Sequence, residues 1–301
     1  MEVKDLHYLD IKMNRVIYSI YIDIPKDELD IFDKNILKKN DTPTNYVTKD
    51  AFKSNYAKLV ACKQWYANEL KVPFIMFEYD SNFIFYKDKM KLQYPFLTSY
   101  NIVNFYKLHL LYELSKKYDE ILYLDFDVVP MKSDNFFETW DLSKGIAIQH
   151  NTHKVKAIEE VTEYTQTIRS PTSKYYNAQA MLIERNLDPI HKVVNTGIIG
   201  INKDHLHKLK YFDNFNNDLN EMSRLKNENY MFPKKITDFF GWDNETLFAV
   251  KLAENDVNVQ WLDNRWHYFF DWQYFVPKET ILCHTINKRF DIVWRAYATN
   301  I

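Results

Sequence analysis

The sequence predicts a single α/β domain with a mostly parallel central sheet and helices on both of its faces. Two observations support this fold class. Short apolar runs rich in β-branched and aromatic residues alternate with longer stretches whose apolar residues recur at helical spacing. No repeat, low-complexity tract or Pro/Ser-rich linker divides the 301 residues. Strand–helix–strand alternation is typical of a parallel sheet buried on both faces.

The first half of the chain supplies the first five expected elements in order. Residues 15–24 (RVIYSIYIDI) read as a buried strand that ends before Pro25. Residues 51–70 have helical spacing, and 73–79 (PFIMFEY) form a second strand. A long amphipathic helix is expected over 101–117, followed by a strand over 121–124 (ILYL).

Later elements are fewer and less regular. Strands are expected over 145–149 and 196–201, and the Asn-rich segment 211–235 is expected to be surface helix and loop. Asp243 precedes an apolar run and is expected to cap a helix.

Composition excludes several classes of protein. The 39 Lys+Arg against 41 Asp+Glu give a net charge of −2, so no basic surface for nucleic acid is expected. A hydrophobic share of 46% excludes a disordered chain. Two cysteines, Cys62 and Cys283, exclude a disulfide scaffold and favour a reducing compartment. Without a long apolar run or a secretory signal, we expect a cytoplasmic protein with no membrane span, or one in the host cytoplasm if a virus encodes it.

Glycine is the most unusual count. A chain of this length would ordinarily hold roughly 20 glycines, and this one has four: Gly145, Gly197, Gly200 and Gly241. The glycines that remain in such a chain are expected where a side chain cannot fit. For Gly197 this predicts a positive φ angle or a close approach of the backbone to a ligand.

Two acids follow the strand over 121–124 directly, at Asp125 and Asp127. Ligands of open α/β sheets bind beyond the carboxyl ends of strands, and paired carboxylates there suit a hard divalent cation. The same pair could also be solvated acids at a turn. A third interpretation is a resemblance to haloacid-dehalogenase-type phosphatases, in which Asp125 would be the nucleophile and Asp127 the general acid/base. That family's usual glycine after the second acid and its later acidic cluster are both missing.

Residues 101–130 resemble nucleotide-sugar glycosyltransferases of the GT-A (Rossmann-like) fold. The resemblance is closest to the retaining family that includes glycogenin and bacterial lipopolysaccharide galactosyltransferases. It depends on Lys107 in the helix before the strand and on the run Tyr123-Leu124-Asp125-Phe126-Asp127. It implies that the two aspartates hold Mn2+ or Mg2+ against the diphosphate of a UDP-sugar and that Lys107 faces this donor.

Three later segments continue the resemblance in the family's order. Residues 195–202 (NTGIIGIN) match a strand whose Asn195 would contact the donor sugar and whose Gly197 would admit it. Residues 240–245 (FGWDNE) match a segment in which Asp243 and Asn244 would act on that sugar. His284 would complete the metal site, and Lys288 or Arg289 would bind phosphate. We also expect Tyr21, in the first expected strand, to bind the donor.

The resemblance therefore implies a metal-dependent enzyme that moves a hexose from a UDP-sugar to a hydroxyl of a glycan, protein or small molecule, with retention of configuration. An inverting enzyme would use Asp243 or Glu245 as its base. Residues of about 12–150 would form the nucleotide-binding half of the domain, and about 190–295 the donor-sugar and acceptor half. The alternatives are the phosphatase above and a nucleotide-sugar-binding protein without turnover.

Overall fold

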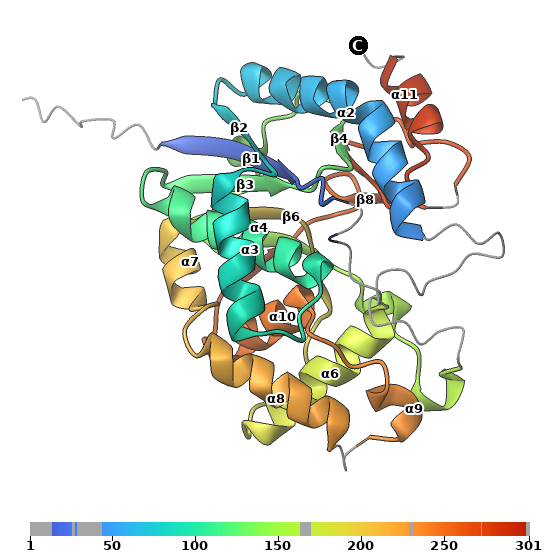
Figure 1. Ribbon diagram of the computed structural model, residues 1–301. Coiled ribbons are helices and arrows are strands. Elements are labelled where there is room, and N and C mark those ends of the chain that lie inside the picture. Colours follow the sequence, from blue (N-terminus) through green and yellow to red (C-terminus); the bar gives the residue numbers. More distant parts are fainter. Residues whose placement is uncertain are drawn as a thin grey trace, which may run out of the picture.

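A computed structural model describes residues 14–25, 28, 44–162, 170–228, 232–271 and 273–298, and shows two β-sheets surrounded by helices (Figure 1). The larger sheet has six strands in the order β2-β1-β3-β6-β5-β7, and the smaller has three in the order β4-β9-β8. Within the described part of the chain, no helix is both long and apolar enough to cross a membrane. Cys62 and Cys283 are both buried as free thiols.

The larger sheet consists of β1 (Arg15–Tyr21), β2 (Phe74–Glu78), β3 (Glu120–Leu124), β5 (Ile146–His150), β6 (Val194–Asn202) and β7 (Val259–Trp261). β1 pairs in parallel with β2 and β3, and β5 pairs in parallel with β7. β6 is the exception, because it runs antiparallel to both β3 and β5. The predicted α/β class with a mostly parallel central sheet is confirmed, and the expected strands lie within a few residues of the observed ones.

The smaller sheet consists of β4 (Val128–Pro130), β8 (Tyr268–Phe270) and β9 (Leu282–Thr285). β9 pairs antiparallel with β4, with Val128 opposite His284, and parallel with β8. Because β4 begins one residue after Asp127, this pairing carries the late segment of the chain to the end of β3. Sequence patterns did not predict this sheet.

The helices are α2 (Thr44–Glu69), α3 (Ser81–Gln93), α4 (Ser99–Ser115), α5 (Phe136–Thr139), α6 (Pro171–Glu184), α7 (Lys203–Leu209), α8 (Phe215–Asn227), α9 (Lys234–Thr237), α10 (Asn244–Glu254) and α11 (Phe290–Ala298), with 3-10 turns η1 (Thr152–Lys154) and η2 (Ile158–Glu160). In Figure 1, α2 and α11 lie on one side of the larger sheet, and α3, α4, α7 and α10 lie on the other.

Side-chain alternation along β1 explains how helices cover both faces. Val16, Tyr18 and Ile20 belong to the same buried cluster as the inner side of α4, whereas Ile17 belongs to the cluster that contains Tyr66 of α2. Successive strand residues point to opposite faces, so one apolar strand serves two hydrophobic layers. This double burial is what an uninterrupted apolar strand predicts.

Local sequence fixes the two helices that border the site. The Thr98 side chain accepts from the backbone N–H of Asn101, and Asn101 returns a bond to the Thr98 backbone, so a capping box starts α4. The Asp243 side chain accepts from the N–H groups of Glu245 and Thr246, which confirms the predicted cap of α10.

Segment 211–235 contains α8, as expected, but this helix is not confined to the surface. Phe215, Leu219 and Met222 are buried in the main core, so α8 contributes one apolar face to the fold. Residues 229–231 lie outside the described part of the chain.

Candidate active site

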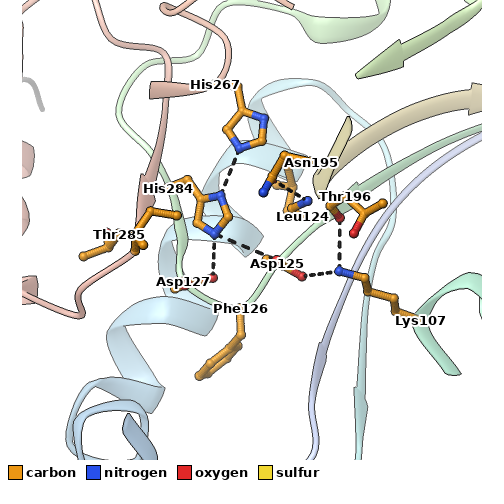
Figure 2. A network of polar contacts seen from close by, with 12 residues as sticks. Lys107, Leu124, Asp125, Phe126, Asp127, Asn195, Thr196, His267, His284 and Thr285 are labelled. Carbon is orange, nitrogen blue, oxygen red and sulfur yellow. Dashed lines mark hydrogen bonds and ion pairs between the residues drawn. The ribbon is translucent and has the colours of Figure 1, made fainter. Parts of the chain in front are cut away.

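Three side chains meet at the carboxyl end of β3. Asp125 and Asp127 follow this strand, and β9 brings His284 beside them (Figure 2). His284 Nε2 lies 3.4 Å from Asp127 Oδ1 and 3.9 Å from Asp125 Oδ2. One potential ligand atom from each residue lies within 4.8 Å of the others, and this is the sole such His/Cys/Asp/Glu group in the described part of the chain. Two carboxylates and an imidazole fit a divalent cation that accepts oxygen and nitrogen ligands.

Gly197 makes room for His284. A Cβ atom on Gly197 would lie 2.7 Å from His284 Nδ1 and closer still to Cε1, within van der Waals overlap. Its φ angle is not positive, since Gly145 is the glycine with a positive φ angle among the described residues. The expectation of a positive φ at Gly197 is therefore wrong, and the close approach seen here is to a protein side chain. Gly197 is required because the imidazole ring packs against its backbone.

Gly197→Ala is expected to lower the free energy of unfolding by roughly 1–3 kcal/mol, the usual cost of overpacking, and to weaken Mn2+ binding by displacing His284. The control is the same change in a His284→Ala background, where the contact with the imidazole is gone and only Asn195 Oδ1, 2.9 Å from the added Cβ, remains close. Denaturant titration of the four proteins measures the coupling. An equal loss of stability in both backgrounds would show that His284 is not the obstacle.

The carboxylate of Asp127 is contacted by two basic side chains. Its side chain is buried, and Lys288 Nζ donates to its Oδ2 while His284 faces its Oδ1. Burial alone would raise the pKa of Asp127, but the ammonium of Lys288 and then the neighbouring His284 ring outweigh burial and hold this pKa below its usual range. Asp127 is thus an anion at neutral pH. Arg289 points elsewhere, with its guanidinium over the ring of Tyr274.

Asp125 is held by residues of two elements. Lys107 Nζ on α4 lies 3.2 Å from Asp125 Oδ1 and donates also to the carbonyl of Thr196 on β6. The hydroxyl of Tyr123 donates to the same Oδ1. The other oxygen of Asp125 therefore remains directed toward His284. The buried cation Lys107 offsets one of the two carboxylate charges at the site.

A pocket of about 430 Å³ opens in front of these residues, between β1, α2 and α4. Asp125, Asp127, Lys107 and Lys288 are among the residues that line it. Tyr21 also lines it, and its ring stacks on Phe126 with 4.6 Å between ring centroids and 24° between planes. The remaining residues that line the pocket are Ile20, Ile22, Asp23, Ile24, Thr48, Lys49, Phe52, Tyr100, Val103, Asn104, Tyr123, Phe126 and Ile286.

Asn195 supports the strand next to His284. Its Oδ1 accepts from the backbone N–H of Gly197 at 3.0 Å, so this amide group supports the part of β6 whose Gly197 carbonyl accepts from the backbone N–H of Asp125. Asn195 is half-buried.

The start of α10 contacts the other side of β6. Asn244 Nδ2 donates to Thr196 Oγ1 at 2.9 Å, and Glu245 Oε1 accepts from both the backbone N–H and the hydroxyl of Thr196. Successive residues of a strand face opposite sides of the sheet. Because His284 packs on the face of β6 to which a Cβ of Gly197 would point, Asn244 and Glu245, which contact the Thr196 side chain, lie on the opposite face. The structure thus joins this segment to the candidate cation site through Thr196.

A largely buried lysine pairs with the acids of this segment. Lys174 on α6 forms an ion pair with Glu245 and lies 3.8 Å from Asp243 Oδ2. Burial opposes ionisation of Glu245, but Lys174 and then Lys107 lower its pKa. For Asp243, burial is the largest effect and leaves its pKa raised.

Sequence reasoning missed four supporting residues: Lys63, Lys174, Thr196 and His267. Lys63 is fully buried and donates to the carbonyl of Phe126 at 2.8 Å, between the two aspartates. His267 is also fully buried, and burial followed by the neighbouring His284 lowers its pKa well below the usual value. A lysine inside an apolar helical pattern was the available signal for Lys63; His267 stands in an aromatic run that gave none.

No model of a known protein family matches the sequence, and no curated protein matches it. Several solved structures are similar in shape. One is a glycosyltransferase involved in glycosylation of the major capsid of PBCV-1, with 12% identity, 94% of this chain and 99% of that chain covered, and a TM-score of 0.41. Another is galactosyltransferase LgtC in complex with donor and acceptor sugar analogues, with 12% identity, coverage of 95% and 94%, and a TM-score of 0.43.

Mouse xyloside xylosyltransferase 1 in its apo form is similar too, with 11% identity, coverage of 91% and 98%, and a TM-score of 0.44. All three are glycosyltransferases, which is the class that the sequence motifs resemble. The identities are too low to carry an activity over to this chain, so the chemistry of its own site has to support one.

Proposed function

We propose that this protein is a metal-dependent glycosyltransferase that moves a hexose from a UDP-sugar to an acceptor hydroxyl, with retention of configuration. The convergence of Asp125, Asp127 and His284 beside a pocket in which Lys107 and Lys288 contact the two aspartates carries the proposal. A nucleoside diphosphate leaves with concentrated negative charge, and a site that has cations in place beforehand lowers the barrier to its departure.

Mn2+ or Mg2+ bound by these three ligands would supply Lewis-acid stabilisation of the diphosphate. The chain supplies the other positive charges. Lys107 neutralises Asp125, and Lys288 stands beside Asp127 at the rim of the pocket, where its ammonium could also donate to a phosphate oxygen. Both lysines therefore favour an anionic leaving group at this position.

The remaining parts of the pocket suit a nucleoside. Tyr21 offers the face of an aromatic ring, and Asp23 offers a carboxylate that could accept from sugar hydroxyls. We assign the nucleotide to residues of about 12–150 and the donor sugar and acceptor to about 190–295. Asn195 and Gly197 would border the sugar. Asn244 would act through Thr196, to which it donates, and Asp243 through the helix α10 that it caps.

The phosphatase alternative lacks the parts that it needs. Its metal would require a further acidic cluster, and the one candidate metal group in the described residues has a histidine as its third member. Asp125, the required nucleophile, has one oxygen engaged by Lys107 and Tyr123. These contacts favour a role for Asp125 as a metal ligand over a role as a nucleophile.

The test is to incubate the protein with a panel of UDP-sugars, with Mn2+ and with EDTA, and to measure UDP and phosphate. Metal-dependent release of UDP without phosphate supports glycosyl transfer, either to an acceptor or, more slowly, to water. Phosphate release would indicate the phosphatase. Binding of a UDP-sugar with no product, in the presence of candidate acceptors, would indicate the binding protein.

Retention is expected because neither candidate base is free. Glu245 is bound to Lys174 and Thr196, and Asp243 caps α10 beside the same lysine. A base for inversion must lie about 3 Å from the proton of the acceptor hydroxyl. NMR measurement of the anomeric coupling in the product should show an α linkage from an α-linked UDP-sugar. A β-linked product would make Asp243 or Glu245 the base and contradict this prediction.

A further inference from the structure

A second histidine stands directly behind the proposed metal ligand. His267 precedes β8 and is fully buried, and its Nε2 lies 2.9 Å from His284 Nδ1 (Figure 2). The opposite nitrogen of His284, Nε2, faces the carboxylates of Asp125 and Asp127. The two nitrogens of His284 therefore have separate partners, one on each side of the ring.

The hydrogen bond to His267 is linked to the state of His284 Nε2. A neutral imidazole has one ring proton, and a nitrogen that binds a metal must be the one without it. When His284 binds metal through Nε2, its proton lies on Nδ1 and needs an acceptor, which His267 Nε2 provides. When His284 Nε2 instead donates to Asp127, Nδ1 accepts, and His267 Nε2 must be the donor.

The far nitrogen of His267 allows both arrangements. Its Nδ1 is buried and has no hydrogen-bond partner among the described residues, so no group behind the ring fixes which nitrogen of His267 holds the proton. A carboxylate in this place could only accept, and a lysine could only donate. An imidazole with an unconstrained far side can do either.

We propose that His267 is a positioning residue that sets the tautomer of His284 and lets it alternate between a hydrogen bond to Asp127 and an open Nε2 for the metal. This inference rests on the metal site of the proposed function. In the change, the shared proton moves from His267 Nε2 to His284 Nδ1. The proton of His284 Nε2 leaves to solvent, and the buried His267 Nδ1 takes one up when a local opening of the fold admits water, so the pair holds two protons in both states.

Two variants separate this role from simple packing. His267→Leu removes the polar partner, and we expect the affinity for Mn2+ alone, measured by calorimetry without nucleotide, to fall about 10- to 100-fold, as for other residues that orient a metal ligand. His267→Gln keeps an amide that can accept or donate and should bind Mn2+ within a few-fold of the wild type. His109→Leu, a half-buried histidine stacked on Tyr86 away from the site, is the matched control and should leave the affinity unchanged.

The wild-type protein gives an independent readout. Long-range 1H–15N spectra of 15N-histidine protein should place the His284 proton on Nε2 without metal and on Nδ1 with saturating Mg2+. An unchanged tautomer, or a folded His267→Leu protein with wild-type Mn2+ affinity, overturns the proposal. His284→Ala distinguishes the causes: if it too leaves Mn2+ binding intact, the metal site of the proposed function fails, whereas loss in His284→Ala alone refutes only the role of His267.

Discussion

Asp127→Asn is expected to abolish metal-dependent UDP release while the protein stays folded. The change replaces a buried anion that faces both His284 and Lys288 by a neutral amide of the same shape. Loss of an anionic metal ligand removes several kcal/mol of charge stabilisation. At about tenfold per 1.4 kcal/mol, a loss of roughly 4 kcal/mol corresponds to about 10³-fold in rate. Mn2+ calorimetry and UDP release measure the two consequences separately.

The control for this variant is Asp88→Asn, because the Asp88 side chain is 68% exposed and lies on α3. It should keep both Mn2+ affinity and UDP release. Circular dichroism establishes that each variant is folded. If folded Asp127→Asn protein released UDP at the wild-type rate, or if wild-type protein were fully active in EDTA, the site would not depend on a metal held by Asp127.

Sequence patterns predicted the elements that are regular and buried. The strands that hold Tyr18 and Tyr123 were visible because apolar residues bury on both faces of the sheet. The cap at Asp243 was visible because the residues that satisfy the first N–H groups of a helix are few. The smaller sheet was not predicted, because its strands are short and pair residues far apart in the chain, such as Val128 and His284.

Some residues of the candidate site could be predicted from the sequence, and others could not. Asp125, Asp127 and His284 could be proposed because each directly follows or ends an apolar run, and the structure places them together. The function of Gly197 could be anticipated only in part, since nothing in its neighbours reveals that a ring 87 residues later packs against it. Supporting contacts such as that between Lys63 and Phe126 depend on tertiary packing alone.

These supporting contacts form one continuous polar network. Asp125 is linked to Lys107, Lys107 to the Thr196 carbonyl, and Thr196 to Glu245. Glu245 is in turn paired with Lys174 on α6. Acids and lysines alternate along this path on either side of the neutral Thr196, and the side chains other than Asp125 are at most 12% exposed. The position of Lys107 at the candidate cation site therefore depends on a lysine that does not line the pocket.

Lys174→Met is accordingly expected to lower the free energy of unfolding by about 3–5 kcal/mol at pH 7, because it leaves the buried Glu245 anion without its partner. The stem of methionine still fills the space of the lysine stem. Glu245→Gln added to Lys174→Met should restore part of the loss. Lys234→Met, which removes an exposed pair with Asp238, is the control and should change stability by less than about 0.5 kcal/mol.

The pH dependence gives this last prediction its sign. In the wild type, Lys174 helps to hold the Glu245 pKa below its unfolded value, so this contribution is present at neutral pH and is lost as pH falls through the folded pKa. Without Lys174, burial raises the pKa values of Glu245 and Asp243, and the folded variant binds more protons than the unfolded chain as pH falls. The stability deficit should therefore be largest near pH 7 and shrink toward pH 4.5. Urea titrations of the wild type and Lys174→Met across this range decide the matter, and a deficit that is constant with pH would show that lost packing, and not an unpaired charge, destabilises the variant.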